Sequence, residues 1–276
     1  MGEVAVIGFG EAGMALTPAG ARGFDIRLDE SKRADFGRCG VRGCATAAEA
    51  LSGATIVLSL VTADQAVHAA EANAPHLDPG TLWLDLNSVS PDTKRSAARA
   101  VEQAGGRYVD VAVMAPVLPA RRGVPLLVAG PHAEAAVAAL AETGFDNLRA
   151  VAGPVGAAAA IKMIRSVMIK GIEALSAECA LAANAAGVLP EVLASLGEEW
   201  PTRFDYNIDR MMVHGTRRAA EMSEVVATLD ALGTGSAMTR ATQERQAALG
   251  AIALSPPPGL TAKLDALLRR HKEEAA

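Results

Sequence analysis

The chain has 276 residues, half of them hydrophobic and only 3% aromatic, and a formal net charge of −5 at pH 7. This length allows one large domain or two moderate domains with a substantial core, and the composition is that of a helix-rich globular protein. The net negative charge argues against a nucleic-acid-binding surface, because such surfaces are basic.

The first thirteen residues predict a strand, a glycine turn and the start of a helix. Val4 to Ile7 is an apolar run with the length of a buried parallel strand. Gly8, Gly10 and Gly13 follow with the spacing G-x-G-x-x-G. The first allows a tight turn, the second lets a pyrophosphate approach the backbone, and the third lets the helix lie close to the strand. The helix N-terminus directs N–H groups at the phosphate, which predicts a dinucleotide site formed by Gly8, Phe9, Gly10, Glu11, Ala12 and Gly13.

An acidic residue follows this turn at the distance typical of dinucleotide-binding folds. Gly23 to Asp29 is interpreted as a second strand that ends in Asp29. A carboxylate in that place accepts hydrogen bonds from the adenosine ribose and repels a 2′-phosphate, and Glu30 adds a second negative charge. We therefore expect NAD to be favoured, with NADP possible because Lys32 and Arg33 are close to the same place. The alternative for Asp29 is a solvated turn residue.

Two further predicted strands end in small polar residues. Ala54 to Leu60 is a largely apolar run, as in a strand buried on both faces, and Thr81 to Leu86 is the next strand. Ligands of such sheets bind at the carboxyl ends of the strands. We therefore expect Val61, Thr62 and Asn87 at the cofactor and Ser88 at the cofactor or the substrate. The alternative role for Asn87 and Ser88 is helix capping, because Ser90 and Pro91 are suited to begin a helix.

The remaining part of the first half predicts two more strands around a proline-rich segment. Arg107 to Val113 and Val124 to Ala129 have the pattern of strands. Residues 114–123 contain two prolines and cannot form a central strand.

The second half of the chain has the composition of helices. Residues 157–186 contain no proline and are rich in strong helix formers, which predicts one long helix between two domains. Shorter helices are predicted over 190–196, 204–213, 216–231, 237–249 and 260–271. We predict an α/β plus all-α protein, with a doubly wound parallel sheet of the Rossmann type in residues 1–152 and an all-helical domain in residues 153–276.

Cysteine content and hydropathy predict the compartment. Cys39, Cys44 and Cys179 are too few and too scattered for a disulfide framework or a zinc site, so we expect reduced thiols and no metal. No signal peptide precedes the first strand, and no apolar stretch of about 20 residues is free of charges. We therefore expect a cytoplasmic protein that binds neither membrane nor nucleic acid.

The order of these segments resembles the β-hydroxyacid dehydrogenases, relatives of 6-phosphogluconate dehydrogenase, over essentially the whole chain. The matching segments are the glycine turn, Asn87–Pro91, Asp110–Gly130, and Gly153-x-x-Gly156 followed by Lys162. The resemblance implies a Rossmann domain, a long interdomain helix and a helical domain that forms a homodimer. It also implies hydride transfer between a nicotinamide cofactor and a small hydroxy acid or related alcohol, with Lys162 as the general acid or base.

This chemistry places demands on Lys162 and its neighbours. A lysine removes a hydroxyl proton if burial lowers its pKa, and a position near a helix N-terminus acts in the same direction. Ser166 and Arg165 lie about one turn further along the helix, where Ser166 is a candidate catalytic residue and Arg165 a candidate for binding a substrate anion. The alternative is that Lys162 is a surface lysine that snorkels to solvent, which is how we interpret Lys170.

The sequence also departs from the family pattern. Met114-Ala115-Pro116 stands where the family has Ser-Gly-Gly, whose N–H groups hold the substrate carboxylate, and proline has no N–H. These three residues remain the candidates for substrate contact, with a weakened carboxylate anchor. Ser166 replaces the family's asparagine, and the roles of Arg217, Arg218 and Glu221 stay open. Two alternatives are therefore kept, namely an imine reductase and a dinucleotide-binding protein without catalysis.

Overall fold

The computed structural model describes residues 3–274, with side chains described up to residue 270. Contacts divide the chain into two compact units, Met1–Met163 and Ile164–Ala276. The division falls within helix α7 (Ala157–Ala185), whereas the boundary expected from the sequence lies in the loop that precedes this helix. Each unit has an apolar core of its own.

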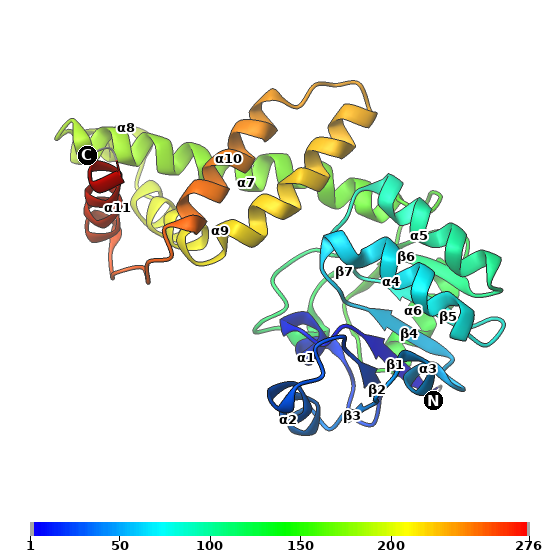
Figure 1. The fold of residues 1–276 in the computed structure, drawn as a ribbon. Helices are drawn as coiled ribbons and strands as arrows, with labels where there is room; N and C mark the ends of the chain where they lie inside the picture. The colour runs from blue at the N-terminus through cyan, green and yellow to red at the C-terminus, as the bar shows by residue number, and fades with distance from the viewer. Residues whose placement is uncertain (1–2, 275–276) are drawn as a thin grey trace. The chain divides into compact units, whose positions relative to one another are not determined.

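The first unit contains an eight-stranded sheet with the order β3-β2-β1-β4-β5-β6-β7-β8 (Figure 1). Neighbouring strands are parallel except for β7, which is antiparallel to β6. The predicted Rossmann-type sheet is therefore confirmed, while the short strands β3 and β8 and the direction of β7 were not predicted. The strands are β1 Val4–Ile7, β2 Arg22–Phe24, β3 Arg42–Gly43, β4 Ile56–Ser59, β5 Leu82–Asp85, β6 Arg107–Val113, β7 Leu126–Ala129 and β8 Leu148–Ala150.

Helices cover both faces of this sheet. Side chains of α1, α2 and α6 share a core with Val6 and Leu58, and those of α3, α4 and α5 share the other core with Ala5 and Val57. Successive strand residues thus enter opposite cores, as the period of two requires. The helices are α1 Glu11–Leu16, α2 Glu30–Arg38, α3 Ala47–Leu51, α4 Ala66–Asn73, α5 Pro91–Gln103 and α6 Ala133–Glu142, with 3-10 turns η1 Ala63–Gln65, η2 Ala74–His76 and η3 Arg121–Gly123.

The prediction that the second strand runs to Asp29 is wrong. Strand β2 ends at Phe24, and Ile26 is 79% exposed, so the alternating pattern after Phe24 has no core to face. Asp29 is instead the N-cap of α2, and its Oδ1 accepts a hydrogen bond from Lys32 N at 2.8 Å. The acid that directly follows the strand is Asp25.

The second unit is built from helices only, within the described residues. They are the later part of α7, α8 Leu189–Leu196, α9 Trp200–Ala231, α10 Ala237–Ala251 and α11 Leu260–Glu274. The break expected near residue 215 is absent, because Gly215 serves close packing of α9 on α10. A Cβ at Gly215 would lie 2.3 Å from Gln246 O, and one at Gly250 would lie 2.2 Å from Thr216 N.

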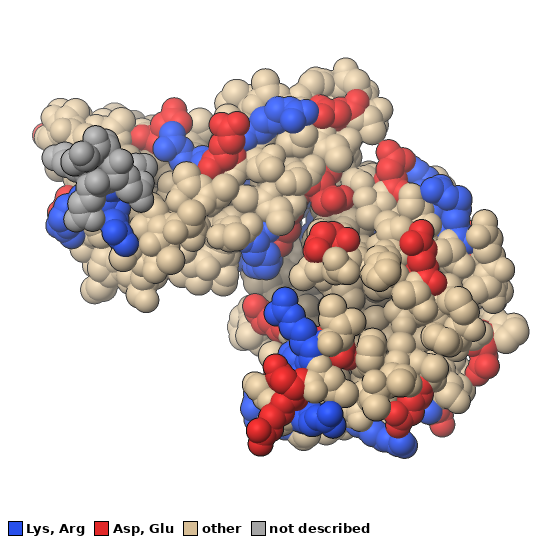
Figure 2. Space-filling model, in the orientation of Figure 1, with Lys and Arg blue, Asp and Glu red and all other residues tan. Residues whose placement is uncertain are grey.

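Helix hydropathy and surface charge bear on the expected absence of membrane and nucleic-acid partners. None of the helices formed by residues 3–274 is long and apolar enough to cross a membrane. On the face drawn in Figure 2, acidic and basic residues are interspersed and not separated by sign.

Candidate active site

The three glycines of the turn after β1 are required for three different reasons. Gly8 has a φ of +87°, and a Cβ there would lie 2.4 Å from Leu60 O. A Cβ at Gly13 would lie 2.7 Å from Gly8 O, so this glycine sets the close approach of α1 to the turn. A Cβ at Gly10 would meet nothing within 4 Å. The turn is therefore packed at Gly8 and Gly13 and open at Gly10, where the fingerprint predicts a pyrophosphate.

Phe9 joins this turn to the end of β2. Its ring is buried and stacks on Phe36 with the centroids 4.1 Å apart, so the ring belongs to the core. Its N–H donates to Asp25 Oδ2 at 2.7 Å, and Lys32 Nζ donates to Phe9 O at 2.6 Å. Asp25 was not among the predicted site residues. Asp25 is the first acidic residue after β2, so it could have been predicted only if the end of β2 had been predicted correctly.

Of the other two predicted residues in the turn, Glu11 is exposed in the first turn of α1 and Ala12 is half-buried. Thr62 is exposed and precedes the 3-10 turn η1. Glu11 and Ala12 follow Gly10 directly in the chain, whereas Thr62 follows the end of β4, and of the three only Glu11 has a charged side chain.

Asn87 connects the carboxyl ends of β4 and β5. Its Oδ1 accepts from Val61 N at 2.8 Å, and its Nδ2 donates to Ser59 Oγ at 3.1 Å. Asn87 is 5% exposed, and both polar atoms of its side chain take part in these contacts within the protein. The predicted helix start is confirmed, because Ser90 is the N-cap of α5 and its Oγ accepts from Thr93 N at 3.2 Å.

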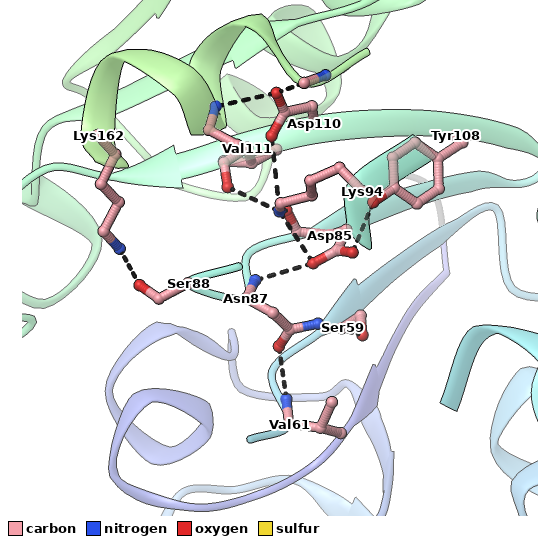
Figure 3. A network of polar contacts seen from close by, with 12 residues as sticks. Ser59, Val61, Asp85, Asn87, Ser88, Lys94, Tyr108, Asp110, Val111 and Lys162 are labelled. Atoms are coloured by element: carbon pink, nitrogen blue, oxygen red, sulfur yellow. Dashed lines mark hydrogen bonds and ion pairs between the residues drawn. The ribbon is translucent and has the colours of Figure 1, made fainter. Parts of the chain in front are cut away.

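Lys162 and Ser88 are brought together from distant parts of the chain. Lys162 Nζ donates a hydrogen bond to Ser88 Oγ, and both residues are half-buried (Figure 3). Ser88 is held next to Asn87, and Val61, which Asn87 contacts, lies beside Gly8. A continuous series of contacts thus joins the glycine turn to the Lys162 amine within the first unit.

The segment after β6 offers few groups to an anion. Met114 is half-buried and its N–H donates to Pro125 O at 2.9 Å, while Ala115 and Pro116 are exposed. Pro116 has no N–H, and none of the three side chains bears a charge. The structure thus places this predicted substrate segment at the carboxyl end of β6, with weak means of holding a carboxylate.

Ser166, Arg165 and Lys170 belong to the second unit. The expectation that Lys170 is a surface lysine is wrong, because it is 7% exposed. Its Nζ donates to Ser166 Oγ at 3.2 Å and pairs with Glu221 Oε2 at 3.1 Å. Burial lowers the pKa of Lys170, and the charge of Glu221 opposes this shift. Arg165, by contrast, is exposed.

A second buried ion pair lies in the same unit. Arg218 pairs with Glu173, and Gln246 Nε2 donates to Glu173 Oε2 at 2.9 Å. All three side chains are buried, whereas Arg217 is exposed and pairs with Glu221. Arg217 and Glu221 thus pair within α9, while Arg218 and Glu221 pair with Glu173 and Lys170 of α7. These ion pairs were not predicted from the sequence.

A mostly parallel sheet with a glycine turn after β1 and polar residues at the ends of β4 and β5 defines a dinucleotide-binding α/β protein. Residues 3–153 match the family model of the NAD binding domain of 6-phosphogluconate dehydrogenase. The chain therefore belongs to this family of hydroxyacid dehydrogenase-like oxidoreductases. Residues 183–249 match a domain of unknown function, DUF1932.

Individual relatives are consistent with this assignment. An NAD-dependent L-serine dehydrogenase of Pseudomonas aeruginosa is 28% identical over 71% of this chain and 69% of its own length. A conserved hypothetical protein from Sinorhizobium meliloti has a solved structure with 37% identity and a TM-score of 0.77, covering 98% of this chain and 97% of that one.

Two more distant solved structures share the fold. The 3-hydroxyisobutyrate dehydrogenase of Mycobacterium tuberculosis, solved with L-serine, is 17% identical with a TM-score of 0.75, covering 97% of this chain and 99% of that chain. An imine reductase of Streptomyces aurantiacus is 21% identical with a TM-score of 0.54, and the match covers 96% of this chain and 99% of that chain.

Proposed function

We propose that the protein is an NAD-dependent oxidoreductase that transfers hydride between nicotinamide and the hydroxyl-bearing carbon of a small hydroxy acid or related alcohol. This proposal rests on the contact of the Lys162 amine with Ser88 Oγ, because Ser88 follows the carboxyl end of β5 and an amine there is a candidate for proton transfer. The family match supports the cofactor class. The open space at Gly10 fits a dinucleotide phosphate.

In this proposal the residues of the chain bind the cofactor, orient the lysine amine and accept a proton from the substrate. Lys162 Nζ accepts the proton of the substrate hydroxyl, and the Ser88 hydroxyl holds the amine in place. Ser166, in the next turn of α7, is the second candidate for orienting the amine. Gly10 and the first turn of α1 receive the pyrophosphate. The nicotinamide, when bound, supplies the hydride acceptor, and no metal is required for such a step.

The substrate class is tested with a panel of small acids. L-Serine and 3-hydroxyisobutyrate are the first members, because these compounds are named for proteins similar to this chain. Reduction of NAD by one or more hydroxy acids supports the proposal. Activity only toward cyclic imines, with NADPH as donor, supports the alternative of an imine reductase, which the poor anion anchor at Ala115 and Pro116 favours.

We predict that NAD binds at least several-fold more tightly than NADP. We assign to Asp25 the ribose contact first expected of Asp29, because Asp25 follows β2 directly and already holds the glycine turn through Phe9 N–H. Asp25→Asn should narrow the preference for NAD by about tenfold, since the charge that repels a 2′-phosphate is lost. Calorimetric titration of both dinucleotides measures this ratio.

Asp29→Asn is the matched control, because asparagine caps a helix as well as aspartate does. It should leave the ratio of the two affinities unchanged. If Asp29→Asn relaxes the preference and Asp25→Asn does not, the assignment to Asp25 is wrong.

We also predict a homodimer formed through α7. Ile164, Met168 and Leu175 lie on one exposed row of this helix, with exposures of 49%, 63% and 56%. In an antiparallel pair of α7 helices centred between residues 171 and 172, Met168 of each copy faces Leu175 of the other, and Arg165 faces Glu178. Covering this row removes apolar surface from water.

Light scattering of Met168→Glu tests the dimer. Wild type should have the mass of two chains at micromolar concentration, and Met168→Glu that of one. Met238→Glu is the control, because Met238 is 67% exposed on α10 and outside the row. A wild-type protein with the mass of one chain contradicts the prediction.

A further inference from the structure

Helix α5 carries a lysine whose amine lies inside the first unit. Lys94 is 1% exposed, and its Nζ donates to Asp85 O at 2.6 Å and to Asp85 Oδ1 at 3.0 Å. Asp110 Oδ1 lies 3.5 Å from the same nitrogen. A buried ammonium is tolerated where it is paired and hydrogen-bonded. The ammonium of Lys94 therefore lies between the buried carboxylates of Asp85 and Asp110 and pairs with both.

The first carboxylate supports the segment that carries Ser88. Asp85 is the last residue of β5, and its Oδ1 accepts from Asn87 N at 2.9 Å. Its Oδ2 accepts from the Tyr108 hydroxyl at 2.6 Å. Burial, together with the charge of Asp85, raises the pKa of Tyr108, so the phenol keeps its proton and remains a donor. Asp85 thus fixes the backbone one residue before Ser88.

The second carboxylate supports the helix that carries Lys162. Asp110 is fully buried on β6, and its Oδ2 accepts from Gly156 N and from Ala159 N, each at 3.0 Å. These N–H groups belong to the start of α7. Asp110 therefore caps the N-terminus of this helix, a role that a side chain close in sequence usually has. Lys162 follows Ala159 by about one turn, so the position of Asp110 sets the position of its amine.

The contacts close into a ring, drawn in Figure 3. From Lys94 one branch passes through Asp85 to Ser88, the other passes through Asp110 and the start of α7 to Lys162, and the two branches meet where Lys162 Nζ contacts Ser88 Oγ. We propose that Lys94 is a positioning residue for proton transfer, which holds Asp85 and Asp110 together and so keeps the Lys162 amine against Ser88. This inference rests on the proposed function of Lys162.

Removing the ammonium has a definite consequence. In Lys94→Met the two carboxylates face one another without a counter-charge, so the local net charge changes from −1 to −2. Like charges in a buried site repel strongly. We expect Asp85 and Asp110 to separate and the Ser88 and Lys162 segments to move with them, while the glycine turn on β1 is unaffected.

The kinetic test compares Lys94→Met with the double variant Lys94→Met/Asp110→Asn. Lys94→Met should lower kcat by about tenfold or more and leave the Kd for NAD within about twofold, a split that general instability does not produce. In the double variant the local charge returns to −1, and the asparagine Oδ1 still accepts from Gly156 and Ala159 N–H. The double variant should therefore recover most of the lost kcat. Failure of this recovery in a folded double variant overturns the proposal.

Amide hydrogen exchange gives a readout that is independent of turnover. Exchange over residues 86–90 and 155–162 should be at least tenfold faster in Lys94→Met than in wild type, and exchange over β1 should be unchanged. A uniform increase over the whole first unit, or no increase in these two segments, overturns the proposal. If Lys94→Met does not fold, Lys94→Gln, which keeps a donor to Asp85, takes its place in both experiments.

The two possible failures are distinguishable. If no compound is turned over by wild type but exchange responds as expected, the proposed function is wrong and Lys94 still holds the two segments together. If turnover is found and Lys94→Met retains more than half of kcat with unchanged exchange, the role of Lys94 is wrong and the proposed function stands.

Discussion

Replacement of Lys162 by alanine should lower turnover by about 10²- to 10⁴-fold, the usual contribution of a positioned proton-transfer group. The affinity for NAD should change little, because the glycine turn and Asp25 are the residues proposed to bind the phosphates and the ribose. Steady-state kinetics with the best substrate of the panel, and calorimetry with NAD, measure the two quantities on one preparation. Retention of more than about a tenth of wild-type turnover would show that another group transfers the proton.

Lys162→Arg is the matched variant for charge. A guanidinium stays protonated and cannot accept the hydroxyl proton, so this variant should be nearly as slow as Lys162→Ala. Lys170→Ala, which a sequence-based argument would use as a mild control, is unsuitable. It removes a buried amine and the buried ion pair between Lys170 and Glu221, so it should destabilise the second unit.

Gly8→Ala should destabilise the first unit by about 2 to 5 kcal/mol. About 1 to 2 kcal/mol comes from the positive φ of Gly8, and about 1 to 3 kcal/mol from overlap of the new Cβ with Leu60 O. Gly20→Ala separates the two terms, because Gly20 has a similar φ of +85° and open space around its Cβ. The control should lose only the backbone term, and unfolding in urea measures both variants. Equal losses would show that close packing at Gly8 contributes nothing.

Gly10→Ala isolates binding from folding. Gly10 has a φ of −82°, which any residue adopts, and its Cβ position is open. Stability should therefore change by less than about 0.5 kcal/mol. The affinity for NAD should fall by about tenfold or more, because the methyl group occupies the space where the pyrophosphate approaches. An unchanged Kd would show that the phosphates do not pass over Gly10.

Features that depend on neighbouring residues in the chain were predictable from the sequence. The glycine turn, the Ser90 N-cap, the strand β6 and the long helix α7 follow from local patterns, and the structure has each of them. The end of β2 was misjudged, because alternation after Phe24 resembles a strand and only the lack of a facing core ends it. Because of that error the expected acid was Asp29, whereas the acid that directly follows β2 is Asp25.

Features made by tertiary packing were not predictable. Lys94, Asp85 and Asp110 come from α5, β5 and β6, and no spacing in the sequence indicates that they meet. Lys170 resembles a surface lysine until α9 brings Glu221 to it. Gly215 resembles a helix break until α10 packs against it. In each case the deciding partner is distant in the chain.

The central claim is that this protein transfers hydride from a hydroxy acid to NAD, and one measurement tests this claim directly. The protein is mixed with NAD and each hydroxy acid of the panel, and the appearance of reduced nicotinamide is followed with protium or deuterium on the hydroxyl-bearing carbon. We predict enzyme-dependent formation of NADH with at least one acid, slowed by the deuterium and abolished in Lys162→Ala. Saturable binding of NAD without reduction by any compound of the panel, or of NADPH without oxidation by any imine, would contradict the account and leave a dinucleotide-binding protein without catalysis.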